Sequence, residues 1–295
     1  MAQTRRIRMQ NKDRSHQSAE FFALPLGAMA NPTNRTRISP CGMAFGSFWV
    51  DSWSCSAFMN VTHKLTKLAD GSALKSAGSA FDRWRQPINR EKVLDQIDQA
   101  GLEQIRARHA VPGERTHWPK YLDAPRWTQL NIRRAQELRL KLRPKPLRIL
   151  DLGSGAGYFL LVAKYLGHSG IGVDIADPEM YGEMFELFGF QRVIWEINAF
   201  QRLPDLGEKF DLVTAFSICF NGHKRPDLWG PKEWEFFLDD LHTHVLKSPG
   251  EIFLGMNPEE DGSFYNSKLK DFFLQRGARI DRSKIWFRGE VVGDR

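Results

Sequence analysis

The spacing of hydrophobic residues changes near residue 81 of the chain. Upstream of it, apolar residues form short patches without a helical or strand period, among frequent Ser, Ala, Asn, Gly and Arg. Such a segment lacks the apolar surface for a packed core, so we expect residues 1–80 to be a disordered or non-native N-terminal extension. Downstream, apolar residues recur at helical spacing through residues 89–109 and again from Asp123 to Leu140, which predicts two helices.

From residue 146 onward, short apolar runs alternate with amphipathic stretches. The expected strands are residues 147–152, 170–175, 192–197, 210–219 and 251–256, the expected helices are residues 158–166, 179–188, 232–246 and 263–276, and a terminal hairpin is expected at residues 278–288. This alternation is typical of βαβ units. Because the strands carry few internal polar residues, they fit a mostly parallel sheet with helices on both faces. The predicted fold class is therefore α/β.

A glycine-rich turn follows the first of these strands and is the most informative segment. It reads Asp151-Leu-Gly153-Ser154-Gly155-Ala-Gly157. Glycine allows positive φ and lets a ligand approach the backbone closely. In an open α/β sheet, such a turn faces the crevice at the carboxyl ends of the strands, where ligands bind. Asp174 ends the next strand, about 20 residues further on, a spacing suited to hydrogen bonds with ribose hydroxyls.

The residues around this turn separate two classes of cofactor. A dinucleotide requires G-x-G-x-x-G, but Tyr158 stands where the third glycine would be. In addition, the carboxylate of Asp151 would repel a pyrophosphate. It suits a cofactor that carries an amino group and a sulfonium cation. The sign of this charge therefore favours a sulfonium cofactor over a dinucleotide.

Four motifs in order resemble those of the class I S-adenosylmethionine-dependent methyltransferases. Residues 149–159 resemble motif I, residues 172–175 the acidic motif that follows, residues 210–221 the fourth-strand motif, and residues 250–258 the fifth strand with its preceding Pro-Gly turn. The resemblance covers about residues 125–295. It implies a Rossmann-like, seven-stranded, mostly parallel sheet of order 3-2-1-4-5-7-6. We expect this domain at residues 146–295, with a helical N-terminal cap at residues 81–145.

The resemblance also implies S-adenosyl-L-methionine as the cofactor and assigns its binding residues. These are Asp151, Gly153, Ser154, Gly155, Gly157, Asp174, Ile175, Asn198, Ala199 and Ser217. Asp151 and the glycine turn would hold the methionine part, and Asp174 the ribose. Asn198 and Ala199 would meet the adenine, with Ile175 and Phe200 on its two faces. Asn198 departs from the family, which often has Asp there, although an amide can still pair with the edge of adenine.

The acceptor is expected to bind after the fourth strand, where residues 217–223 offer polar side chains. His223 is the candidate general base, because a neutral imidazole is well populated near neutral pH. The alternative is a loop histidine without a chemical role. Trp118, Tyr121 and Trp127 are expected near the rim of the cleft. No metal site is expected, because the three cysteines form no C-x-x-C pair.

The charge of the chain modifies this interpretation only slightly. Lys and Arg outnumber Asp and Glu by 42 to 35, and the excess lies almost entirely in residues 1–80. If that extension is non-native, Met43 and Met59 are the candidate translation starts. The remainder is nearly neutral, so a nucleic-acid partner is not expected. A local basic cluster between Arg126 and Arg148 is interpreted as a solvated helix face or, alternatively, as a nucleic-acid patch.

The sequence therefore predicts a cytoplasmic methyltransferase that acts on a small molecule. The cytoplasm is expected because the cofactor is made there and the few cysteines suggest a reducing compartment. The sequence contains no uninterrupted apolar run of about 18 residues, so no membrane span is expected. The alternatives are an RNA or protein methyltransferase, an NAD-linked oxidoreductase, and a cofactor-binding module without catalysis. The acceptor, the methylated atom and the oligomeric state are left open.

Overall fold

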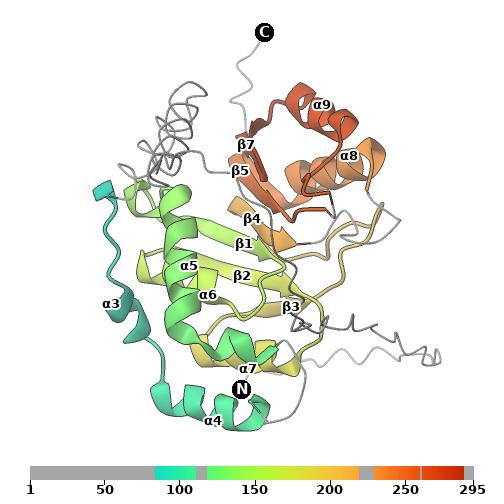
Figure 1. Ribbon diagram of the computed structural model, residues 1–295. Helices are drawn as coiled ribbons and strands as arrows, with labels where there is room; N and C mark the ends of the chain where they lie inside the picture. The colour runs from blue at the N-terminus through green and yellow to red at the C-terminus, as the bar shows by residue number, and fades with distance from the viewer. Residues whose placement is uncertain (1–83, 111–117, 219–228, 260, 289–295) are drawn as a thin grey trace, which may run out of the picture. The chain divides into compact units, whose positions relative to one another are not determined.

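The computed structural model describes residues 84–110, 118–218, 229–259 and 261–288. These residues form a seven-stranded sheet of order β3-β2-β1-β4-β5-β7-β6 (Figure 1). Strands β1 to β5 pair in parallel, whereas β7 runs antiparallel to both β5 and β6. The α/β fold class and the strand order predicted from the sequence are confirmed. The extension expected at residues 1–80 lies outside the described residues.

The elements lie close to the expected positions. The strands are β1 (Arg148–Leu152), β2 (Ser169–Asp174), β3 (Arg192–Ile194), β4 (Phe210–Ile218), β5 (Leu246–Met256), β6 (Arg279–Asp281) and β7 (Lys284–Arg288). The helices are α3 (Arg90–Leu94), α4 (Gln99–His109), α5 (Ala124–Glu137), α6 (Tyr158–Tyr165), α7 (Glu179–Phe188), α8 (Pro231–Asp240) and α9 (Ser267–Gln275). Shorter turns are η1 (Trp118–Leu122), η2 (Leu140–Leu142) and the π-helical η3 (Leu241–Val245). Within the described ranges, no helix has the length and apolar character needed to cross a membrane.

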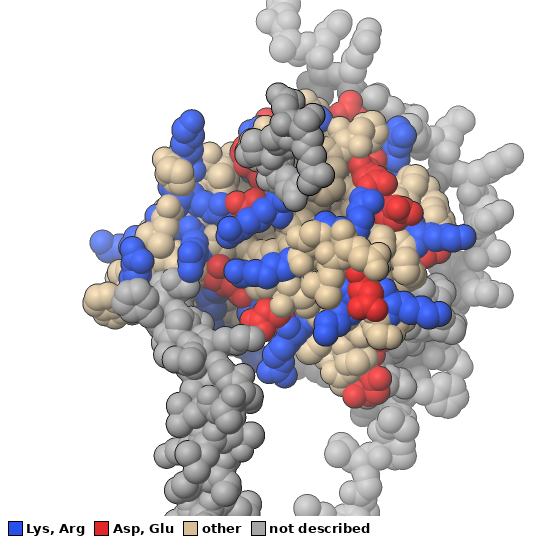
Figure 2. All heavy atoms as spheres, turned by 90° about the horizontal axis from the view of Figure 1, so that it is seen from above, with Lys and Arg blue, Asp and Glu red and all other residues tan. Residues whose placement is uncertain are grey.

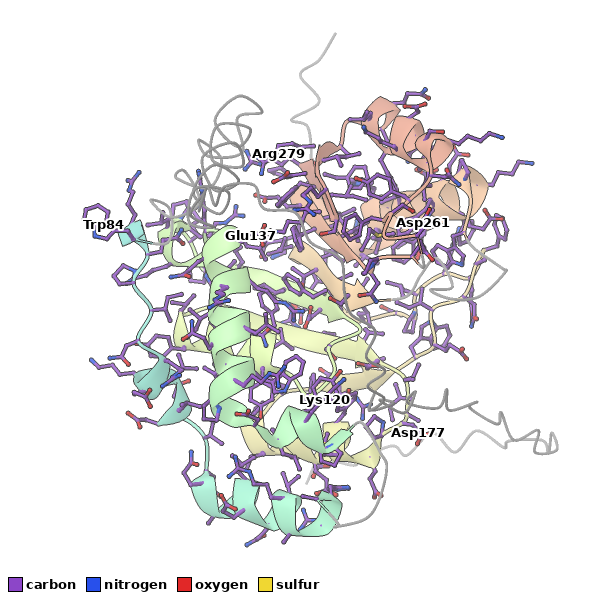
Figure 3. All side chains as sticks on the ribbon, viewed as in Figure 1. Trp84, Lys120, Glu137, Asp177, Asp261 and Arg279 are labelled. Atoms are coloured by element: carbon purple, nitrogen blue, oxygen red, sulfur yellow. The ribbon has the colours of Figure 1, made fainter. Side chains whose placement is uncertain are left out.

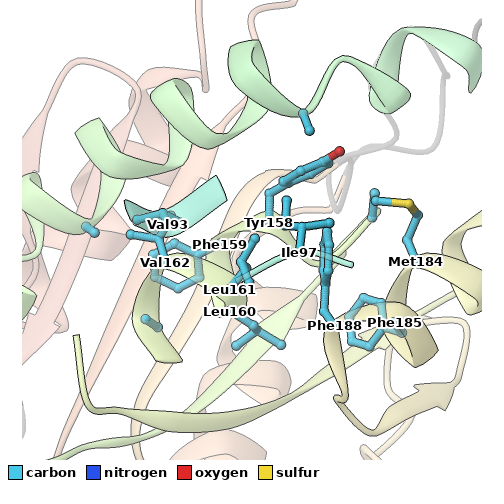
Figure 4. Packing of buried hydrophobic residues seen from close by; sticks show 14 of the residues in the cluster. Val93, Ile97, Tyr158, Phe159, Leu160, Leu161, Val162, Met184, Phe185 and Phe188 are labelled. Carbon is cyan, nitrogen blue, oxygen red and sulfur yellow. The ribbon is translucent and has the colours of Figure 1, made fainter. Parts of the chain in front are cut away.

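Neighbouring side chains of the central strands face opposite layers of helices, as the two-residue period of a strand requires. Ile149 of β1 packs into a cluster with residues of α3 to α7, whereas its neighbour Leu150 packs into a second cluster with residues of α8 and α9. Figure 4 shows part of the first cluster, including Phe159 of α6 and Phe185 of α7. Helices thus bury both faces of the sheet, which explains the nearly continuous apolar sequence of its strands.

The two helices expected within residues 81–145 differ from their expected bounds. The helix expected at residues 89–109 is divided into α3 and α4, because the side chain of Asp98 accepts a hydrogen bond from the Ala100 N–H and starts a new helix. The next helix, α5, ends at Glu137 rather than at Leu140. Arg139 has a φ of 53°, in the left-handed region, which stops the helix before the short turn η2.

The helix expected after the fourth strand is also shorter than its pattern suggested. Residues 232–246 were expected to be helical, but α8 ends at Asp240 and a single π-helical turn follows. Leu246 then belongs to β5, which therefore begins five residues before its expected start. Leu246 is buried and pairs with Phe210 of β4, so the sheet rather than the helix takes up this residue.

The basic cluster between Arg126 and Arg148 does not form one continuous face. Arg143 donates two hydrogen bonds to the carboxylate of Glu251, at 2.5 and 2.9 Å, and Arg148 pairs with Glu208. In the face of the molecule shown in Figure 2, Lys and Arg side chains are interspersed with Asp and Glu. A phosphate backbone favours a contiguous basic surface. The arrangement therefore gives the nucleic-acid interpretation no support, and part of the cluster is ion-paired rather than solvated.

His168 is a buried histidine that links two segments next to β1. Its Nδ1 accepts a hydrogen bond from the Leu147 N–H, and its Nε2 lies 3.0 Å from the carbonyl oxygen of Leu140. Both bonds form together only in a neutral ring that carries its proton on Nε2. Burial lowers the pKa of His168, and the charge of Arg143 adds to this effect, while the hydrogen bond to Leu140 opposes it.

We expect His168 to make the fold less stable in mild acid. Because its pKa is lowered on folding, its stabilisation is complete above the ordinary value of about 6.5 and decreases as the pH falls below it. The free energy of unfolding, measured in urea between pH 8 and pH 5, should depend less steeply on pH in His168→Gln. The exposed His244 provides the control, since His244→Gln should keep the wild-type slope. Equal slopes in all three proteins would contradict the prediction.

Candidate functional site

A cavity of about 1140 Å³ lies at the carboxyl ends of β1, β2 and β4, and we call it the cleft. Nine of the ten cofactor-binding residues expected from the sequence line it: Asp151, Gly153, Ser154, Gly155, Asp174, Ile175, Asn198, Ala199 and Ser217. Gly157 and Phe200 are not among the lining residues. The fold thus brings together residues that are distant in sequence, at the edge where ligands bind in open α/β sheets.

The glycine turn connects β1 to α6 along the floor of the cleft. Gly153, Gly155 and Gly157 have φ values of 63°, 54° and 78°, in the left-handed region that glycine adopts without strain. The turn is tied to the next strand, because the N–H groups of Gly153 and Ser154 both donate to the carbonyl oxygen of Val173. Ser154 Oγ is buried and lacks a hydrogen-bond partner among the described residues.

Asp174 ends β2 with its carboxylate held by two backbone N–H groups. Oδ2 accepts a hydrogen bond from Gly155, at 2.6 Å, and Oδ1 accepts one from Ile175, at 2.8 Å. Burial raises the pKa of Asp174, while these two hydrogen bonds and the charge of Arg192 oppose the rise. A carboxylate has about four acceptor positions. Two of them therefore stay available for donors from a ligand.

Asp151 lies at the end of β1 and is only 3% exposed. Its Oδ1 accepts a hydrogen bond of 2.7 Å from the hydroxyl of Thr214 on β4. Burial raises the pKa of Asp151 to about 7, although the bond from Thr214 and the charge of Arg134 counteract it and the charge of Asp174 adds to it. A buried carboxyl of this kind is half ionised near neutral pH and favours a cationic neighbour.

Arg134 of α5 is a lining residue that the sequence interpretation missed. Its Nη1 donates to Asn131 Oδ1 at 3.0 Å, and its guanidinium lies 4.4 Å from the centroid of the Phe216 ring on β4. Burial lowers its pKa, and the charge of Asp151 opposes this. The sequence placed Arg134 in a surface cluster. Its spacing from Trp127 and Asn131, seven and three residues, would have placed all three on one helix face.

Aromatic side chains from separate elements form a wall above the glycine turn. The ring of Tyr121 in η1 lies 4.4 Å from that of Trp127 and meets Tyr181 of α7 edge-on at 5.5 Å. All three line the cleft, as was expected for Tyr121 and Trp127; the side chain of Trp118 lies outside the described residues. The Trp127 Nε1–H donates to the Lys120 carbonyl oxygen, which fixes the indole against η1. Figure 3 labels Lys120 in η1.

The remaining lining comes from the segments after β2, β3 and β4. Asp177 follows β2 and is labelled in Figure 3. Asn198 follows β3, and its amide donates to Gln201 Oε1 at 3.1 Å, so part of its hydrogen-bonding capacity is used within its own loop. Near the end of β4, the carbonyl oxygen of Ser217 accepts a hydrogen bond from the side-chain amide of Asn257. His223, the candidate base, lies outside the described residues.

A family model described as a methyltransferase domain matches residues 126–220 of the chain. This match includes the glycine turn, Asp174, Asn198 and the whole of β4. It begins within α5, so Arg134 lies inside it and Tyr121 outside. No sequence among curated proteins matches the chain.

Several solved structures are similar to part of the chain. One is the ribosomal protein L11 methylase of Lactobacillus delbrueckii subsp. bulgaricus, at 20% identity over 55% of this chain and 75% of that one, with a TM-score of 0.33. Another is CalS10, an amino pentose methyltransferase of Micromonospora echinaspora involved in calicheamicin biosynthesis, at 26% identity over 48% and 58%, with a TM-score of 0.35. A third is Streptomyces venezuelae DesVI, at 12% identity over 54% and 90%, with a TM-score of 0.39. The matched region thus spans little more than half the length of CalS10.

Proposed function

We propose that the chain is a class I S-adenosylmethionine-dependent methyltransferase that transfers a methyl group from S-adenosyl-L-methionine to a small-molecule acceptor. The proposal is supported by the methyltransferase-domain model that matches residues 126–220 and by the strand order of the sheet. The resemblance drawn from the sequence motifs is confirmed at the level of the family. The cofactor expected from those motifs is the methyl donor of this family. The roles of individual residues and the nature of the acceptor are our proposals.

The cleft fits this cofactor in both charge and hydrogen-bonding groups. At one end, the opposite charges of Asp151 and Arg134 suit the ammonium and carboxylate groups of an amino acid. At the other, the free acceptor positions of Asp174 suit two ribose hydroxyls. Ser154 also lines the cleft, beside Gly153 and Gly155 of the glycine turn. We therefore assign Asp151, Arg134 and Ser154 to the methionine part and Asp174 to the ribose.

The adenine is assigned to the segment after β3. Asn198 and Ala199 line the cleft there, together with Ile175 from the end of β2 and Trp195. The Nε1 of Trp195 is buried without a hydrogen-bond partner among the described residues. Phe200 is not a lining residue and is more than half exposed, so its proposed place against the ring has less support than that of Ile175.

The single observation that carries the proposal is the pair of carboxylates around the glycine turn. Asp174 is oriented by the Gly155 N–H, so an N–H of the turn that a pyrophosphate would need is already used. Asp151 places a second carboxylate beneath the same turn. Both features oppose a polyanion and favour a cofactor with a cationic end. An NAD-linked oxidoreductase is therefore the weaker alternative.

When bound, S-adenosylmethionine supplies an activated methyl group on a positively charged sulfur. The protein holds this group and the acceptor in line, so its main contribution is proximity and orientation. The cleft, at about 1140 Å³, exceeds the usual range of about 300–1000 Å³ for a site that holds one small ligand. It therefore has room for an acceptor beside the cofactor. Trp127 and Leu130 of α5 and Trp229 before α8 supply an apolar wall for it.

These lining residues support a small molecule over RNA or protein as the acceptor. Eight of the lining residues are aromatic and five are acidic, whereas Arg134 is the one Lys or Arg among the described residues that line the cleft. The segment at residues 81–145 would act as a cap, since it supplies Tyr121, Trp127 and Arg134 to the cleft. His223 stays our candidate base if the acceptor needs deprotonation. The cytoplasm stays the proposed location, because the cofactor is supplied there.

The proposal is tested by isothermal titration calorimetry with the full chain. S-adenosylhomocysteine, the product form of the cofactor, should bind with a dissociation constant near the micromolar range, and NAD should not bind. Binding of NAD alone would overturn the proposal, as would binding of neither ligand by a folded protein. Methyl transfer is then tested with tritiated S-adenosylmethionine and pools of small metabolites, RNA and protein, which separates the acceptor classes.

The affinity for S-adenosylhomocysteine should depend on the ionisation of Asp151. Since burial raises its pKa from 3.8 to about 7, the carboxyl is neutral below that pH and no longer attracts the ligand's ammonium group. We expect the dissociation constant to rise as the pH falls through 7, approaching tenfold per pH unit in the acid limit. Calorimetry between pH 8 and pH 5.5 measures this. Asp151→Asn should bind weakly without that dependence, and Asp271→Asn, at an exposed position of α9, should behave as wild type.

A further inference from the structure

Arg192 stands at the start of the edge strand β3, outside the set of residues that line the cleft. Its backbone lies opposite Gly172 in the parallel pairing of β2 with β3. Its side chain extends to the turn that leaves β2. There the Nη2 group donates to the carbonyl oxygen of Ile175 and lies 3.4 Å from that of Ala176. Arg192 therefore holds the two residues that directly follow Asp174.

This contact begins where the regular pairing of the sheet ends. The final hydrogen bond between β2 and β3 in this region runs from the Trp195 N–H to the Asp174 carbonyl oxygen. Beyond it, Ile175 and Ala176 are exposed. The Ile175 N–H donates to Asp174 Oδ1, and the carbonyl oxygen of Ile175 accepts from Arg192. The peptide groups on both sides of Ile175 are thus fixed, one by the carboxylate and one by the guanidinium.

The charge of Arg192 also acts on the same carboxylate. The positive charge of Arg192 lowers the pKa of Asp174 and so opposes the rise caused by burial. The other titratable groups that interact with Asp174 are the carboxyl of Asp151 and the phenol of Tyr181. The guanidinium carbon lies 5.8 Å from the centroid of the Tyr181 ring, at the first turn of α7. Arg192 thus connects the edge strand, the turn after β2 and the start of α7.

We infer that Arg192 is a positioning residue that aims the carboxylate of Asp174 at the ribose hydroxyls of the cofactor. It does so by fixing the Ile175 peptide group and by supplying the positive charge beside the carboxylate. This inference rests on the proposed function, because it takes the ribose of S-adenosylmethionine as the ligand of Asp174. It assigns to an edge-strand arginine a part in cofactor selection, although that arginine is not among the residues that line the cleft.

The experiment compares two ligands, S-adenosylhomocysteine and its 2′-deoxyribose analogue, by calorimetry with the full chain. In the wild type, the ribose form should bind about tenfold more tightly, because the deoxy form lacks a hydroxyl for Asp174. Arg192→Met keeps most of the apolar stem but removes the charge and the donors. It should bring the ratio of the two dissociation constants close to one. Arg192→Lys keeps the positive charge but lacks the forked donors of the guanidinium. It should give a ratio of dissociation constants between those of the wild type and Arg192→Met.

The ratio distinguishes positioning from a general structural role. If Arg192 only stabilises the turn, Arg192→Met should weaken both ligands equally and leave the ratio unchanged, which would overturn the inference. An unchanged affinity for both ligands would overturn it too. Arg133→Met, at an exposed position of α5, is the matched control and should retain the wild-type ratio. If thermal unfolding shows that Arg192→Met is not folded, the ratio of the two dissociation constants in Arg192→Lys tests the inference. A wild-type ratio in Arg192→Lys would then overturn it.

The same measurements separate this inference from the proposed function. A wild-type protein that binds neither ligand would contradict the proposed function itself. A wild-type protein that binds S-adenosylhomocysteine but does not prefer the ribose form would leave the methyltransferase assignment in place. It would overturn the role of Asp174 at the ribose and, with it, the role of Arg192.

Discussion

Asp174→Asn should weaken the binding of S-adenosylhomocysteine by about 100-fold, or about 2.7 kcal/mol. Both oxygens of the carboxylate accept backbone N–H groups, from Gly155 and Ile175. An amide has one oxygen, so its NH2 group would face one of these donors instead of an acceptor. The variant therefore loses a charge-assisted hydrogen bond within the protein and weakens the bonds to the ribose. Hydrogen bonds to charged groups are each worth about 1.5–3 kcal/mol, which sets the expected size.

Calorimetry with S-adenosylhomocysteine measures this effect directly. Asp271→Asn makes the same chemical change at an exposed position of α9, away from the cleft, and should bind as the wild type does. Thermal unfolding of both variants without ligand shows whether Asp174→Asn is folded. A folded Asp174→Asn protein with wild-type affinity would remove Asp174 from the site and leave the cofactor assignment without its main support.

Gly157→Ala should destabilise the protein by about 2–5 kcal/mol, because two effects add. Gly157 has a φ of 78°, which costs a residue with a Cβ about 1–2 kcal/mol. In addition, a Cβ at this position would lie 2.9 Å from the Phe185 ring of α7, in the packed first cluster. Relieving that contact requires a shift of a large buried side chain, which typically costs a further 1–3 kcal/mol, on the order of other overpacked cores.

Gly207 provides a matched control for this prediction. It also has a φ of 78°, but a Cβ there would meet no atom within 4 Å. Gly207→Ala should therefore show the backbone cost alone, and the difference between the two variants should report the collision with Phe185. Urea unfolding of both proteins measures this difference. Equal losses of stability would mean that α7 moves away at no cost, and that the packing of Phe185 does not define the glycine turn.

The sequence by itself determined the sheet and the location of the cleft. The alternation of apolar runs with amphipathic stretches is local information, and it gave the order of elements because each strand and helix must bury its own apolar face. The glycine turn and Asp174 were recognisable for a similar reason. A positive φ favours glycine at one position, and a ribose-binding carboxylate requires Asp or Glu at one position. Both can therefore be recognised from the residue type alone.

Only the tertiary structure showed which charged side chains lie around the glycine turn and Asp174. Arg134 reads in the sequence as one member of a basic cluster, and its place beside Asp151 follows from the packing of α5 over β1 and β4. Arg192 reads as an ordinary residue at the start of a strand. Its contacts with Ile175 and Ala176 exist because β3 pairs beside β2 at the edge of the sheet.

The ends of elements were likewise decided by tertiary contacts. Leu246 fits the helical pattern of α8, yet it lies in β5 because pairing with β4 and burial in the second cluster are available there. Local propensity amounts to a fraction of a kcal/mol per residue, whereas burying one large apolar side chain is worth about 1.5–3 kcal/mol. Where the two disagree, burial prevails. Periodicity therefore predicted which elements form, while their ends and the charged groups around the cleft depended on what packs against them.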